Sequence, residues 1–126
     1  MVAFSYPIRS KYGNKKVVID NITFDSIKEG KRYKELKLLL QVKQIKDLQI
    51  HPSFLLQDKF TDSAGEKHRS ITYEGDFSYR AIQFRRTNEQ LIVEDVKPSL
   101  TFQTQVYKIK KKMFLYKYKD VVFREI

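Results

Sequence analysis

The pattern of apolar and polar residues in the first third of the chain predicts an extended arm followed by a helix. Apolar residues flank Asp20-Asn21, a pair typical of turns, so residues 16–24 are expected to form a hairpin within an N-terminal arm, residues 1–24. Proline is absent from residues 26–41, and apolar side chains recur there at helical spacing, which predicts a helix. The expected inward stripe of this helix is Glu29, Tyr33, Leu36 and Leu40.

The remainder of the chain shows strand-like patterns interrupted by one further helical pattern. A polar segment, residues 58–67, is expected to form a hairpin loop between the first two strands. The other expected elements are strands over 45–56 with a kink at Pro52, over 69–82 and over 90–97, a second helix over 101–116 and a closing strand over 121–126. The apolar face of the second helix is expected to contain Phe102, Val106, Ile109, Met113 and Tyr116.

The order of these elements defines the expected fold class. A helix, a three-strand antiparallel meander, a second helix and a closing strand make an α/β or α+β domain, with a central mixed sheet covered by helices on both faces. The length of 126 residues fits one domain over residues 1–126. No run approaches the ~20 apolar residues of a membrane span, and no leader-like pattern opens the chain. We therefore expect a soluble, cytoplasmic protein that does not enter a membrane.

Composition restricts the chemistry open to the chain. Lys and Arg outnumber Asp and Glu by 25 to 15, and the formal net charge of +10 favours a polyanionic partner such as nucleic acid. Without cysteine there can be no disulfide and no thiolate metal site. The two histidines, His51 and His68, have no second histidine at metal-binding spacing and are expected to be structural or surface residues. A metal site would therefore use mainly carboxylate oxygens and favour magnesium or manganese.

Two acids on neighbouring strands form the first part of a candidate site. If the second and third strands turn symmetrically about Arg85-Arg86, Asp76 lies opposite Asp95. Strand alternation places Lys97 on the same face as Asp95. Opposed carboxylates repel each other unless a cation lies between them, which predicts a divalent metal ion. The alternative is a pair of ordinary strand-end acids, one of them bridging to Lys97. Two neighbouring acids are second-choice ligands, Glu74 and Glu94.

An acid on the inward stripe of the first helix completes the candidate site. Because the stripe must face the sheet, the Glu29 carboxylate is expected near Asp76 and Asp95. A hard cation held by these three acids could bind a phosphate and activate a water, while Lys97 orients that water or offsets charge on the phosphoryl oxygens. The alternative for Glu29 is a capping box with Ser26, worth about 1 kcal/mol, and both roles could coexist.

Basic residues interleaved with tyrosines form a candidate nucleic-acid interface. The expected phosphate-backbone contacts are Lys108, Lys110, Lys111 and Lys112 on the second helix, Arg85 and Arg86 at the predicted turn, and Lys15 and Lys16 in the arm. Such contacts position DNA and do not read its sequence. The alternative is a solvated helix face with the tyrosines in the core.

Several phrases of the sequence resemble a known family. They are SKYGNKKV at 10–17, TFDS at 23–26, ITY at 71–73 before Asp76-Phe77, VEDVK at 93–97 and YKIKKK at 107–112. Together they extend over nearly the whole chain and resemble a family of small phage and prophage proteins of unknown function that is placed in the PD-(D/E)xK nuclease superfamily. The expected order of elements is also similar to the restriction-endonuclease-like core of that superfamily.

The resemblance implies a metal-dependent nuclease and gives roles to the same residues. Asp76 corresponds to the first aspartate of the superfamily motif, Asp95-Val96-Lys97 to its acid-x-lysine half, and Glu29 to the acid that many members have on the first helix. Gly75 replaces the proline that often precedes the first aspartate. Gly30 interrupts the helix at a cost of about 1 kcal/mol relative to alanine, which could loosen the placement of Glu29.

The leading hypothesis is a small phage-type DNA endonuclease that hydrolyses phosphodiester bonds with magnesium or manganese. The resemblance favours branched or recombination-intermediate DNA, such as a Holliday junction, as substrate. So short a chain would cleave both strands as a homodimer, in the cytoplasm of a bacterial host if phage-encoded. The alternative is a non-catalytic DNA-binding or assembly protein on a nuclease-derived fold. RNA binding is less favoured, because no RNP-like or KH-like segment occurs.

Overall fold

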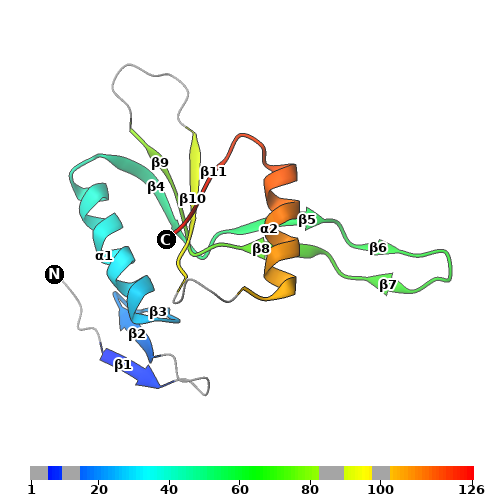
Figure 1. Cartoon of the computed structure of the whole chain (residues 1–126), viewed down its shortest axis with the longest axis horizontal. Coiled ribbons are helices and arrows are strands. Elements are labelled where there is room, and N and C mark those ends of the chain that lie inside the picture. Colours follow the sequence, from blue (N-terminus) through cyan, green and yellow to red (C-terminus); the bar gives the residue numbers. More distant parts are fainter. Residues whose placement is uncertain (1–5, 10–14, 83–89, 98–102) are drawn as a thin grey trace.

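The chain is a mixed α+β protein with a mixed sheet and two helices in the part that the structure describes (Figure 1). The structure is a computed structural model that describes residues 6–9, 15–82, 90–97 and 103–126. Its elements in chain order are β1 (Tyr6–Arg9), β2 (Lys15–Ile19), β3 (Ile22–Phe24), α1 (Ile27–Gln41), β4 (Ile45–Ile50), β5 (Ser53–Gln57), β6 (Phe60–Thr61), β7 (Lys67–His68), β8 (Ile71–Glu74), β9 (Phe77–Ala81), β10 (Leu91–Asp95), α2 (Gln105–Lys117) and β11 (Val122–Glu125).

The N-terminal arm contains a three-stranded antiparallel sheet in the order β1-β2-β3. The turn between β2 and β3 is Asp20-Asn21, and both residues have left-handed backbone angles, with φ of 52° and 63°. Two-residue hairpin turns often need this conformation, and Asp and Asn tolerate it better than most residues with a side chain. The hairpin predicted for residues 16–24 is therefore confirmed.

Helix α1 begins where the sequence predicts. Ser26 has an extended backbone, and its side-chain oxygen accepts a hydrogen bond from the Glu29 N–H at 3.1 Å, which caps the first turn. The inward stripe is also as predicted, because Glu29, Tyr33 and Leu36 are buried and Leu40 is half-buried. This face packs against β2, β3 and β4.

Gly30 allows α1 to approach β2 closely. A Cβ atom at this position would lie 2.6 Å from Cγ2 of Val17 and 3.0 Å from Cδ1 of Ile19. The glycine thus contributes to holding the helix, and with it Glu29, against the sheet. We expect Gly30→Ala to lower the free energy of unfolding by about 1–3 kcal/mol through overpacking, although alanine is the better helix former. Urea unfolding measures this change, and a stabilised variant would show that the contact does not restrain the helix.

The central sheet has the strand order β11-β10-β9-β4. Strands β4, β9 and β10 pair antiparallel as a meander, and β11 lies parallel to β10, so the sheet is mixed. The pairs from Leu91↔Arg80 to Glu94↔Phe77 have the register predicted for the second and third strands. The predicted meander and closing strand are therefore confirmed.

The kink predicted at Pro52 is confirmed, because the first predicted strand, 45–56, is divided there. The prediction of a continuous strand over 69–82 is corrected, because that strand is divided at the same bend. His51-Pro52 separates β4 from β5, and Gly75-Asp76 separates β8 from β9. Across the bend the His51 N–H donates to Asp76 O, and the Gly75 N–H donates to Pro52 O, both at 2.9 Å. Beyond it, β5 and β8 form a ribbon that β6 and β7, within the predicted loop, extend away from the central sheet (Figure 1).

Hydrophobic side chains form two clusters on opposite faces of β10. Ile92 and Val96 belong to the cluster beneath α1, whereas Val93 belongs to the cluster that contains Phe114 of α2. Successive strand residues point to opposite faces, so a strand buried on both sides contributes to both clusters. The helices therefore lie on opposite sides of β10, although α2 contacts mainly the β5–β8 ribbon.

Helix α2 packs through a different face from the predicted one. Phe114 is fully buried, and its ring centroid lies 4.9 Å from those of Phe54 and Tyr73. A buried aromatic ring removes more apolar surface from water than Val or Ile, so Phe114 determines which face turns inward. Three residues of the predicted apolar face are exposed instead, Val106 at 63%, Ile109 at 58% and Tyr116 at 76%. Phe102 lies outside the described residues.

Candidate metal centre and nucleic-acid interface

Asp76 occupies the bend between β8 and β9. Its N–H donates to Glu94 O at 3.1 Å, and its Oδ2 accepts a hydrogen bond from the Val96 N–H at 2.7 Å. These bonds continue the β9–β10 ladder by one position, and the side chain of Asp76 interacts there with that of Asp95. The backbone of Glu94 in β10 and of Val96 directly after it thus fixes Asp76 in the place that the predicted register implies.

Glu29 reaches the same place from the first turn of α1. The residue is 5% exposed, and Oε1 of its carboxylate is buried without a hydrogen-bond partner in the part of the chain that the structure describes. Glu29, His51 and Asp76 each contribute one potential ligand atom, and these three atoms lie within 4.8 Å of one another. Buried polar atoms are rarely left unpaired, and a cation bound among these atoms would satisfy Oε1. This set of two carboxylates and one imidazole fits a divalent metal ion.

The cap of α1 and the acidic cluster use different atoms of Glu29. Its backbone N–H is bonded to Ser26 Oγ, so the serine half of the predicted capping box is present. Its carboxylate lies with Asp76 and His51. The helix start therefore helps to hold the acid at the cluster.

Asp95 and Lys97 lie on the side of Asp76 nearer to α2. Asp95 Oδ2 accepts a hydrogen bond from Tyr73 OH at 2.7 Å and lies 3.2 Å from Lys97 Nζ, so the bridge to Lys97 that the alternative interpretation of these acids includes is present. Lys97 Nζ is also 3.3 Å from the centroid of the Tyr107 ring, a cation–π contact. Asp95 is not one of the three residues whose ligand atoms gather within 4.8 Å. Asp76 thus lies between an acid–imidazole group and an acid–lysine pair.

Glu94, a second-choice ligand, is held apart from this cluster by Arg32. Its side chain is completely buried, and its two oxygens accept hydrogen bonds from Arg32 Nε at 2.7 Å and Nη2 at 2.6 Å. Tyr79 OH donates a third hydrogen bond to the same carboxylate. Glu74, the other second-choice ligand, is exposed on β8. Neither acid belongs to the group of ligand atoms around Asp76.

Burial and the crowding of acids control protonation in the cluster. Burial, a hydrogen bond with Asp95 and the charge of Glu29 together raise the pKa of Asp76 to about 9. Burial also raises the pKa of Glu29. Without a cation Asp76 therefore retains its proton at neutral pH. Binding of a divalent ion must displace this proton, so the affinity for the ion is expected to rise with pH.

The raised pKa of Asp76 gives the metal-free protein a characteristic pH dependence. An unfolded chain loses this proton near pH ~4, whereas the folded protein retains it to about pH 9. The contribution to stability is therefore greatest at low pH and is lost as pH rises through this window. With a chelator present, we expect the melting temperature to fall by at least about 10 °C between pH 5 and pH 9, and Asp76→Asn to remove most of this fall.

The same melting experiment is repeated at pH 8 with a metal ion in place of the chelator. Saturating manganese should raise the melting temperature of the wild type, because it binds the folded state, and should leave Asp76→Asn nearly unchanged. Equal pH slopes in the two proteins, or equal responses to manganese, would contradict the assignment of Asp76.

His51 is the cluster residue that sequence reasoning missed, since it was expected to be structural or a surface residue. No histidine or cysteine spacing indicates it as a ligand. The bend brings it to Asp76 by a backbone hydrogen bond and toward Glu29 on α1. The one sequence signal is its position directly before Pro52, at the predicted kink.

His68 lies in a second group of potential ligands, on the β6–β7 hairpin with Asp62 and Glu66. Asp62 Oδ2 lies 2.8 Å from His68 Nε2, and Oδ1 accepts hydrogen bonds from the backbone N–H of Ala64 and of Glu66. The hydrogen bond with His68 lowers the pKa of Asp62. These bonds account for the group as the internal structure of a turn, which agrees with the structural role expected for His68.

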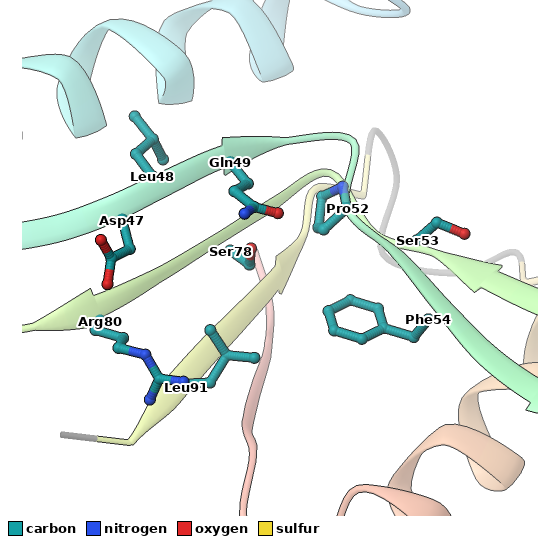
Figure 2. A pocket seen from close by; sticks show the side chains of 9 residues that line it. All are labelled: Asp47, Leu48, Gln49, Pro52, Ser53, Phe54, Ser78, Arg80 and Leu91. Atoms are coloured by element: carbon teal, nitrogen blue, oxygen red, sulfur yellow. The ribbon is translucent and has the colours of Figure 1, made fainter. Parts of the chain in front are cut away.

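An open pocket of about 460 Å³ adjoins the bend (Figure 2). Its lining residues are Asp47, Leu48, Gln49, Pro52, Ser53, Phe54, Ser78, Arg80 and Leu91. Ser78 and Leu91 lie on the face of the central sheet opposite to Ile92, and hence away from α1. Pro52 connects the pocket with the acidic cluster, but Glu29, Asp76, Asp95 and Lys97 do not line it.

The predicted basic contacts differ in their exposure. Lys108 and Lys112 are exposed on α2, whereas Lys110 is half-buried and Lys111 is paired with Glu125. In the arm, Lys15 is exposed and Lys16 lies 3.9 Å from Asp25. Arg85 and Arg86 lie outside the described residues. Of the described candidates, Lys15, Lys108 and Lys112 are therefore the most accessible to a polyanion.

Fold and site together define a mixed α+β protein with a partly buried acidic cluster and a basic helix whose Lys108 and Lys112 are exposed. A family model described as "Protein of unknown function (DUF1064)" matches residues 9–126, and the chain belongs to this family. No match was found among curated proteins or among solved structures. Neither α1 nor α2 is long and apolar enough to cross a membrane.

Proposed function

We propose that the protein is an endonuclease that hydrolyses phosphodiester bonds in DNA with a bound magnesium or manganese ion. The observation that supports this most is the buried Oε1 of Glu29 beside Asp76, because this atom has no hydrogen-bond partner among the described residues and a bound cation would satisfy it. The net charge of +10 supports a polyanionic substrate. A lysine paired with an acid next to the cluster supports reaction at a phosphate.

Each residue of the cluster has a role in this proposal. The cation would polarise a phosphoryl oxygen and lower the pKa of a water molecule. Glu29 and Asp76 would hold it, and Asp95 would complete the acidic side of the site. Lys97, whose ammonium is fixed by Asp95 and Tyr107, would orient the attacking water or stabilise charge on the phosphoryl oxygens.

The resemblance to PD-(D/E)xK nucleases supports the same assignment. Asp76 and Asp95-Val96-Lys97 match the two halves of that motif, and Glu29 matches the helical acid. The order of α1, the β4–β9–β10 meander, α2 and β11 is compatible with a restriction-endonuclease-like core, which we propose for this domain. By the same resemblance we propose a phage-type enzyme that acts on branched or recombination-intermediate DNA, as a homodimer.

The test is incubation of the purified protein with labelled linear, flapped and four-way-junction DNA, with magnesium, manganese or a chelator. We expect cleavage that requires the metal ion and is fastest on branched DNA. Light scattering on the same sample should give the mass of a dimer. Metal-independent binding to all three substrates without cleavage would instead favour a non-catalytic DNA-binding or assembly protein.

The exposed lysines of α2 should contribute to affinity without affecting metal binding. The double variant Lys108→Ala/Lys112→Ala removes two expected phosphate contacts, so log Kd against log salt should lose about two units of slope. Fluorescence anisotropy with duplex DNA measures this. The control is Lys31→Ala/Lys34→Ala, which removes two exposed lysines from α1. Equal loss of slope in both variants would show that only net charge matters.

A further inference from the structure

We propose that His51 is a third protein ligand of the divalent ion, and that its imidazole makes the centre prefer a transition-metal ion such as manganese to magnesium. The inference deepens the proposed function and rests on it, because it requires an ion at Glu29 and Asp76. His51 would add a nitrogen ligand to a site that was predicted from the carboxylates of Glu29, Asp76 and Asp95 alone.

The spacing of the three side chains supports a shared ion. His51 Nε2 lies 3.6 Å from Glu29 Oε1, and the ligand atoms of His51, Glu29 and Asp76 all lie within 4.8 Å of one another. Atoms that bind one octahedral ion at about 2.1 Å are separated by roughly 3 to 4.2 Å. The 3.6 Å separation is too long for a hydrogen bond, and Oε1 has no hydrogen-bond partner among residues 6–9, 15–82, 90–97 and 103–126. A small cation between the two groups accounts for both facts.

The backbone holds His51 in an unfavourable conformation at this point. Its φ is +52°, in the left-handed region, although the residue precedes Pro52 and is therefore biased toward extended angles. The His51 N–H donates to Asp76 O at 2.9 Å, which connects two of the three proposed ligands directly. Such backbone strain persists where the surrounding structure enforces it, frequently at functional sites.

Exposure and chemistry distinguish His51 from the acid beside it. The His51 side chain is 33% exposed, whereas that of Glu29 is 7% exposed. The imidazole thus borders solvent, where water or a phosphate oxygen could occupy the remaining coordination positions. Magnesium is bound almost entirely by oxygen ligands, whereas an imidazole nitrogen increases affinity for transition-metal ions. The predicted all-carboxylate centre would not favour manganese in this way.

The experiment detects the metal–nitrogen bond without requiring DNA cleavage. Manganese is added to the full-length protein, and pulsed EPR measures modulation from a directly bound ¹⁴N nucleus. The chain has two histidines, so His68→Asn is the matched control for His51→Asn. Asparagine tolerates the left-handed backbone of residue 51, and thermal melting with a chelator checks that each variant folds.

We expect the nitrogen signal in the wild type and in His68→Asn, and its loss in His51→Asn. The affinity for manganese, from the EPR signal of the free ion, should fall at least about tenfold in His51→Asn. Competition should show a smaller loss for magnesium. A folded His51→Asn that retains the signal, or its loss in His68→Asn, would overturn the proposal. Manganese binding by the wild type without nitrogen modulation would refute the His51 ligand and leave the carboxylate site standing, whereas no binding would refute both.

Discussion

Replacing Asp95 with asparagine is expected to abolish DNA cleavage while leaving DNA binding and folding nearly unchanged. Asparagine keeps an oxygen that can accept the hydrogen bond from Tyr73 OH, so the local packing is retained. It removes the negative charge next to Asp76 and the ion pair with Lys97. If the charge contributes about 4 kcal/mol to transition-state stabilisation, the cleavage rate falls about a thousandfold.

Lys97→Ala should also reduce the rate of DNA cleavage, because it removes the ammonium group and leaves the acids in place. The ammonium lies between Asp95 and the Tyr107 ring, where it can act on a substrate phosphate. Single-turnover cleavage of a labelled junction measures both variants, and anisotropy measures their affinity for the same DNA. Lys31→Ala is the matched control, because Lys31 is an exposed lysine on α1 that belongs neither to the cluster nor to the expected DNA contacts. Cleavage by Asp95→Asn at the wild-type rate would remove Asp95 from the catalytic site.

The second large effect concerns stability. Arg32→Met should lower the free energy of unfolding by about 3–5 kcal/mol, because it leaves the Glu94 carboxylate buried without its ion-pair partner. The Arg32 guanidinium binds both carboxylate oxygens, a geometry that lysine could not reproduce. Urea unfolding at pH 7 measures the loss.

Two further variants separate the ion pair from other effects of the substitution. Lys31→Met, at an exposed position on the same helix, should change the free energy of unfolding by less than about 0.5 kcal/mol. Adding Glu94→Leu to Arg32→Met should recover much of the lost stability, because no unpaired charge remains buried. A small loss in Arg32→Met, close to that of Lys31→Met, would contradict a structural role for the ion pair.

The local features of the fold could be predicted because they depend on neighbouring residues. The Asp20-Asn21 turn, the Ser26 cap and the inward stripe through Glu29 each follow from short-range chemistry. The β9–β10 register also followed from symmetry about the predicted turn at Arg85-Arg86, and it brought Asp76 beside Asp95.

Features that depend on tertiary packing were not accessible from the sequence pattern. The packing face of α2 is set by Phe114 against the rings of the β5–β8 ribbon, which helical periodicity alone does not reveal. The shared bend is closed by hydrogen bonds from the His51 N–H to Asp76 O and from the Gly75 N–H to Pro52 O, between residues distant in sequence. For this reason the histidine in the cluster was missed, while the acids around it were predicted.

The most direct test of the central claim is a comparison of the wild type and Asp76→Asn on a labelled four-way junction, each with manganese and with a chelator. Asp76 lies between the Glu29–His51 group and the Asp95–Lys97 pair, so both parts of the proposed site depend on it. We expect cleavage only by the wild type with manganese, and junction binding by both proteins. Cleavage by Asp76→Asn at the wild-type rate, or no cleavage by the folded wild type with manganese, would contradict the central claim.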